Sequence, residues 1–120
     1  MLKISGKQMQ GLTEHAERAF LLKVLDFVVK QLPEYGQLPG DRALAILGAL
    51  VKRAKYYGLE TEKQAAIFVL AAHFLGGDFD MANPDAAQRL NDDNLTAKWK
   101  ANWLEAFAIS FESRRQEDNA

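Results

Sequence analysis

Apolar residues recur along this chain at steps of three and four, the spacing that places side chains on one face of an α-helix. No stretch alternates between apolar and polar residues for long enough to predict a β-strand. The most apolar segment lies at about residues 62–75, where the run from Ala65 to Ala72 has no polar face. Such a helix must be surrounded by other helices. The sequence therefore predicts an all-α fold, a single compact bundle of five to six helices around a central apolar helix.

Two helices are predicted before the loop at residues 33–40. A short helix over residues 6–12, which Gly11 interrupts, leads into a long amphipathic helix that begins near Thr13 and ends at Pro33. Residues 33–40 contain too many prolines and glycines to form anything but a loop.

Capping residues bound the next two helices. Asp41 is the predicted N-cap of the helix that Gly58 ends in a left-handed conformation. Gly48 lies inside this helix, where we expect it to allow a close approach of a neighbouring helix that a side chain would block. Thr61 and Gln64 form a capping box that opens the central helix.

The chain after the central helix alternates between turns and helices. The predicted segments are a loop over 78–82, a short helix over 84–90 capped by Asn83, a turn over 91–94, a long helix over 95–115 and a frayed tail over 116–120.

The composition is that of one globular domain that spans residues 1–120. With 48% hydrophobic residues and a net charge of −1, the chain can bury a core without disulfides or a structural metal. It has no cysteine, which excludes thiol catalysis and cysteine-ligated zinc. Its longest apolar run is far shorter than the ~20 residues that span a bilayer, and the first residues do not have the pattern of a secretory signal. The basic residues are not concentrated in the way that is typical of nucleic-acid-binding proteins. We therefore expect a cytoplasmic protein with no cofactor, metal, nucleic-acid ligand or membrane anchor.

Few residues could carry catalysis. His73 lies on the central helix, and Asp78 and Asp80 alternate in the following loop, where carboxylates can meet on one cation. That cation-loop pattern is not completed, because Ala82 stands at the next alternate position. A histidine at the edge of the core, and aspartates that cap helices or face solvent, explain the same residues. An enzyme that uses His73 or the Asp78/Asp80 pair requires these side chains to line one cavity.

The last predicted helix carries aromatic side chains four residues apart, which places them along one side of the helix. A second apolar flank contains Leu104, Ala108 and Ile109. One flank must cover the core, and part of the aromatic one can then stay exposed for a partner. Packing of all these rings into the core is the alternative. We name this set the aromatic ridge; its members are Trp99, Trp103, Phe107 and Phe111.

Several segments together resemble a known family. The chain contains an Ala-x-x-Tyr-Gly-Leu segment within 54–62 and a capped helix with a Phe-Val pair within 66–69. A Gly-x-x-Phe-Asp loop follows at 76–80. The opening of the chain, with Ile4-Ser5, Gln8-Met9 and Phe20, also fits. Over roughly residues 4–95 the chain resembles small helical accessory proteins encoded in bacterial type VI secretion and polymorphic-toxin gene clusters.

This resemblance implies a cytoplasmic, non-enzymatic protein that binds a secreted toxin or a spike component, and it implies no catalytic residues. The leading hypothesis is an adaptor, chaperone or stabiliser of a type VI secretion effector. An immunity protein that neutralises a cognate toxin is the alternative, and an enzyme is the third hypothesis. For a protein partner, the predicted contact residues are the aromatic ridge and four carboxylates of the acidic segment, Asp78, Asp80, Asp92 and Asp93.

Overall fold

The computed structural model describes the backbone of residues 6–118 and the side chains of residues 14–114. Every regular element in that range is a helix, which confirms the predicted all-α fold. In chain order the elements are α1 (Gly6–Gln31), the 3-10 helix η1 (Pro33–Gln37), α2 (Gly40–Tyr56), α3 (Glu62–Leu75), α4 (Phe79–Ala82), α5 (Pro84–Leu90) and α6 (Ala97–Asp118).

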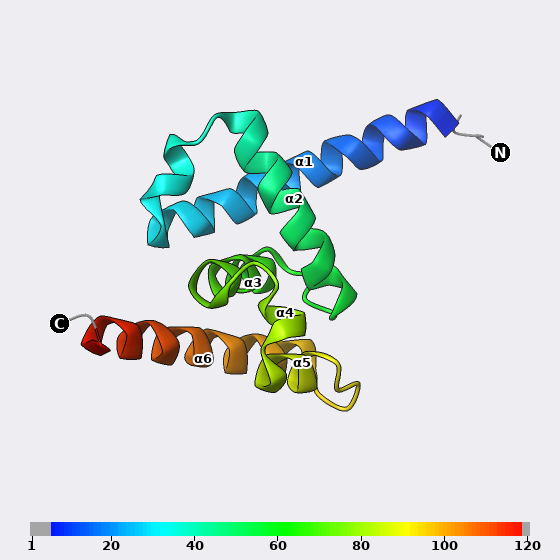
Figure 1. The fold of residues 1–120 in the computed structure, drawn as a ribbon. Coiled ribbons are helices and arrows are strands. Elements are labelled where there is room, and N and C mark those ends of the chain that lie inside the picture. The colour runs from blue at the N-terminus through cyan, green and yellow to red at the C-terminus, as the bar shows by residue number, and fades with distance from the viewer. Residues whose placement is uncertain (1–5, 119–120) are drawn as a thin grey trace.

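The helices form three layers with α3 in the middle (Figure 1). α1 and α2 cross each other on one side of α3, and α4, α5 and α6 lie on the other side. Both α1 and α6 pack against α3, but over the described residues their backbones do not come close to each other. Phe68 and Val69 in the middle of α3 are fully buried. The predicted central helix is therefore confirmed.

Two predicted helix ends are confirmed by their hydrogen bonds. The amide of Gln64 donates to Thr61 Oγ1 over 3.1 Å, and the capping box opens α3 at the predicted residue. Gly58 has a φ of +88°, which a residue with a side chain rarely adopts. The amide of Leu59 beyond it donates to the carbonyl of Ala54, so α2 ends in the left-handed glycine cap that the sequence predicted.

The first two helices differ from the prediction. α1 is continuous through Gly11, so the predicted interruption and the predicted start near Thr13 are wrong. One glycine costs a helix only about 1 kcal/mol, which its helix-forming neighbours offset. Residues 33–37 form a 3-10 helix and not a loop, because proline suits the first position of a helical turn. α2 begins after Pro39, so Asp41 lies in its first turn and not at the N-cap.

The short helices after α3 agree in part with the prediction. Residues 79–82, predicted as a loop, form the single helical turn of α4. Asn83 caps α5 as predicted, because its side-chain oxygen accepts a hydrogen bond of 3.1 Å from the Ala86 amide.

α6 differs from the predicted helix over 95–115 at both ends. It begins after Thr96, whose hydroxyl accepts a hydrogen bond from an amide of the first turn. It continues to Asp118, so most of the tail predicted to fray over 116–120 is helical. Residues 119–120 lie outside the described residues.

Gly48 of α2 faces α1, yet the space beside it admits a side chain. A Cβ at this position would lie 3.7 Å from Leu21 Cδ1, an ordinary contact distance, so the expectation that a side chain would be blocked is wrong.

Glycine inside a helix costs up to about 1 kcal/mol relative to alanine, so we expect Gly48→Ala to raise the free energy of unfolding by about 0.5–1 kcal/mol in urea titrations. Gly58→Ala, at a φ of +88°, should lower it. A loss of stability in Gly48→Ala would contradict the prediction.

Candidate functional site

The middle of the aromatic ridge lies where α5 packs against α6. The rings of Trp103 and Phe107 stack with 4.8 Å between their centroids and 15° between their planes. The guanidinium of Arg89, on α5, lies over the Trp103 ring at 4.6 Å from its centroid. Both rings are half-buried. Arg89, Trp103 and Phe107 therefore form a layered stack held between two helices, which leaves little side-chain entropy to lose on binding.

The two ends of the aromatic ridge are exposed. Trp99 retains 43% of its accessible surface and Phe111 retains 41%. Each step of four residues turns the ridge by about 40° around the helix axis, so its members cannot all face the core. Phe111 also lies beyond Ala108, the last residue that α6 buries among the described side chains. Part of the ridge is therefore open to solvent.

The second apolar flank of α6 covers the core. Leu104 and Ala108 are buried in the main hydrophobic cluster. Ile109, which the sequence placed on the same flank, is 61% exposed. Because two residues along a helix differ by about 200°, Ile109 and Phe107 lie on opposite sides of α6.

An apolar groove opens between α1 and α6, with α3 as its floor. Its volume is about 310 Å³. Ile67 and Leu70 of α3 line the floor, Phe27 lines the α1 rim, and Ile109 lines the α6 rim. We call it the interhelix groove. No sequence pattern predicts it, because it depends on how far apart α3 holds α1 and α6.

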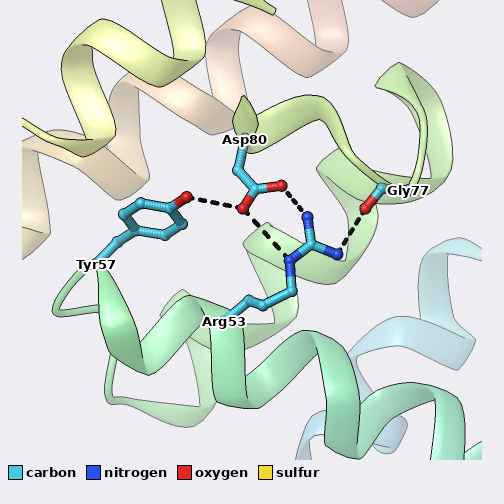
Figure 2. A network of polar contacts seen from close by, with 4 residues as sticks. All are labelled: Arg53, Tyr57, Gly77 and Asp80. Atoms are coloured by element: carbon cyan, nitrogen blue, oxygen red, sulfur yellow. Dashed lines mark hydrogen bonds and ion pairs between the residues drawn. The ribbon is translucent and has the colours of Figure 1, made fainter. Parts of the chain in front are cut away.

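Asp80 was predicted to belong to the contact surface, but it lies inside the fold with 3% exposure. Figure 2 shows its carboxylate paired with the guanidinium of Arg53, while the Tyr57 hydroxyl donates to Oδ2 over 2.8 Å. Arg53 Nη1 also donates to the carbonyl of Gly77 over 2.7 Å. This network joins the C-terminal turn of α2 to α4. The prediction that Asp80 contacts a partner is therefore wrong, because its carboxylate is enclosed and fully engaged.

The phenol of Tyr57 is suited to its role as a donor in this network. Burial raises the pKa of the Tyr57 hydroxyl; the nearby Arg53 lowers it in part, and Tyr56 raises it further. The hydroxyl therefore keeps its proton at neutral pH and can donate to Asp80. Arg53 and Asp80 are 27 positions apart in the chain, and no sequence pattern connects them.

The other predicted site residues are spread over the surface. Asp78 and Asp93 are exposed, and Asp92 is half-buried, with Oδ1 accepting a hydrogen bond from the Asn94 amide in the turn before α6. His73 Nε2 lies 3.7 Å from a carboxylate oxygen of Glu34 on η1. Neither His73 nor the Asp78/Asp80 pair lines the interhelix groove.

Lys100 is a buried cation. The only feature of the sequence that points to its burial is its position on the core-facing side of α6. It is 6% exposed, and its Nζ donates to the carbonyls of Leu90, over 2.8 Å, and Tyr57, over 3.3 Å. These carbonyls lie at the C-terminal ends of α5 and α2, and the C-terminal end of a helix carries partial negative charge. The Lys100 ammonium therefore ties α6 to both helix ends.

The described residues offer neither a metal site nor a membrane-spanning helix. In the part of the chain that the structure describes, no three histidine, aspartate or glutamate side chains gather closely enough to hold a metal ion. No helix there has both the length and the apolar character needed to cross a membrane.

Comparison with known proteins returns no match: no family model, no curated protein and no solved structure is significantly similar to this chain.

Proposed function

We propose that this protein is a non-enzymatic protein-binding module whose contact surface is the aromatic ridge of α6. The observation that carries the proposal is the stack of Arg89, Trp103 and Phe107, flanked by the exposed rings of Trp99 and Phe111. Tryptophan and arginine are the side chains that most often dominate the energy of protein interfaces. Side chains already ordered in the free protein also lose less entropy when a partner binds.

The proposed partner is a secreted toxin effector or another type VI secretion component, and the proposed role is that of an adaptor, chaperone or stabiliser. This part rests on the resemblance of residues 4–95 to accessory proteins of such gene clusters. Asp78, Asp92 and Asp93 would add an acidic surface, which favours a partner with basic residues through electrostatic complementarity.

Ridge variants should bind the partner more weakly than the wild-type protein. Trp99→Ala and Phe111→Ala each remove a ring that is about two-fifths exposed, so the fold should survive. After a tagged pull-down from cells that naturally produce the protein, we expect each variant to raise the Kd of the recovered complex at least about 10-fold in titration calorimetry. Ile46→Ala is the control, because Ile46 is 37% exposed on α2, which does not contact α6.

Two outcomes decide the surface and the role. Unchanged affinity in Trp99→Ala and Phe111→Ala, with both proteins folded, would show that the partner binds elsewhere. Co-expression with the recovered partner, when this is a toxin, separates the two roles. Rescue of the cells indicates an immunity protein, and binding without rescue indicates an adaptor.

A further inference from the structure

The interhelix groove lies on the side of α6 opposite the aromatic ridge, and the proposed function does not use it. Ile109 on the α6 rim is 61% exposed, and Phe27 on the α1 rim is 41% exposed. Together with Leu70 and the mostly buried Ile67 on the floor, they line one apolar groove. Joined apolar surfaces on a soluble domain mark interaction sites more often than isolated apolar residues do.

Charge is divided between the two rims of the interhelix groove. Lys30 lies on the α1 rim and Glu105 lies on the α6 rim, while Lys63 lines the groove from the first turn of α3. Among the residues whose side chains the structure describes, none of these three forms an ion pair. The Lys30 ammonium lies instead 5.7 Å from the centroid of the Phe27 ring. The α1 rim is therefore basic and the α6 rim acidic, and both charges are available to a partner.

A groove with opposite charges on its two rims is complementary to itself. When a two-fold axis runs along the groove, the α1 rim of each copy faces the α6 rim of the other. Lys30 then lies on the same side of the interface as Glu105 of the second copy. A two-fold axis across the groove would instead bring like rims together. The distribution of charge therefore selects the first arrangement.

We propose that the interhelix groove binds a second copy of this chain and forms a symmetric dimer, in which the α1 rim of each copy packs against the α6 rim of the other. The exposed Ile109 side chain of each copy is covered by the apolar surface of the other. The aromatic ridge faces away from this interface, so the dimer presents two copies of the ridge to partners.

Sedimentation velocity of the full chain tests the dimer in the absence of any partner. Between about 1 and about 200 μM protein, we expect the wild-type chain to shift from monomer to dimer. Ile109→Asp places a charge on the apolar α6 rim of the proposed contact and should raise the dimer Kd at least about 30-fold. Tyr56→Asp is the matched control and should leave the Kd unchanged, because Tyr56 is 79% exposed and does not line the groove.

Charge reversal tests the pairing of the rims. Lys30→Glu and Glu105→Lys should each raise the dimer Kd about 5- to 10-fold, because each places like charges across the interface. The double variant should return the Kd to within about 3-fold of the wild-type value. Both residues are exposed, so these variants should fold, which far-UV circular dichroism verifies.

Three results would overturn the proposal. They are a wild-type chain that stays monomeric over the whole concentration range, a dimer that persists in Ile109→Asp, and a double reversal that does not restore association. The first would leave the groove to another occupant, and the other two would place the interface elsewhere. Because no partner is present in these measurements, their failure is independent of the aromatic ridge.

Discussion

Phe68→Ala is expected to lower the free energy of unfolding by about 4 kcal/mol, close to the largest loss that a single core truncation produces. Phe68 has no exposed surface and lies in the middle of the central helix. Its ring centroid lies 4.9 Å from that of Phe79 and 6.0 Å from that of Tyr57, so truncation leaves a cavity between α2, α3 and α4. Urea unfolding monitored by circular dichroism measures the loss.

Two variants accompany this measurement. Phe68→Leu keeps most of the volume and should cost only about 1 kcal/mol, so it gives a value even when Phe68→Ala is too unstable to fold. Tyr56→Ala removes an aromatic ring that is 79% exposed and should change the free energy by less than about 0.5 kcal/mol. Similar losses in Phe68→Ala and Tyr56→Ala would contradict the position of α3 at the centre of the fold.

Arg53→Met should lower the free energy of unfolding by about 3 kcal/mol, because it leaves the carboxylate of Asp80 buried without its counterion. The Arg53 guanidinium lies over the Phe68 ring, 5.7 Å from its centroid. A methionine side chain at position 53 can still cover that ring. The Tyr57 hydroxyl remains as a donor to Asp80, but a neutral donor cannot replace the charge of arginine. Thermal and urea unfolding both report the effect.

A matched control and a double-mutant cycle isolate the ion pair. Lys52→Met removes a cation from the exposed neighbouring position of α2 and should change the free energy by less than about 0.5 kcal/mol. In the Arg53→Met background, Asp80→Asn should cost less than it does in the wild-type protein, because the buried charge has already lost its partner. Additive losses would show that Arg53 and Asp80 do not stabilise each other.

Local signals in the sequence were sufficient for α3, for the end of α2 and for the start of α5. The capping box of Thr61 and Gln64, the glycine cap at Gly58 and the cap at Asn83 involve residues only a few positions apart, so their hydrogen bonds can form wherever the chain lies. The same rules were wrong at Gly11, where a small local cost is outweighed by the rest of a long helix.

The candidate site was only partly visible in the sequence. The spacing of the aromatic ridge is a property of the chain, but its exposure depends on which flank of α6 packs on α3. Leu104 and Ala108 occupy that position, which leaves Trp99 and Phe111 at the surface. The stack of Arg89 on Trp103 requires α5 to lie beside α6, and no spacing in the sequence records that contact.

The sequence by itself determined the helical content, the central apolar helix and several caps, because these depend on propensity, periodicity and hydrogen bonds between near neighbours. Only the tertiary structure decided that Asp80 pairs with Arg53, that Lys100 joins the ends of α2 and α5, and that α1 and α6 leave a groove between them. Each of these features depends on how helices distant in the chain pack in space. A polar residue at a core-facing position shows that it needs a partner, but only the packing of the helices determines which partner it meets.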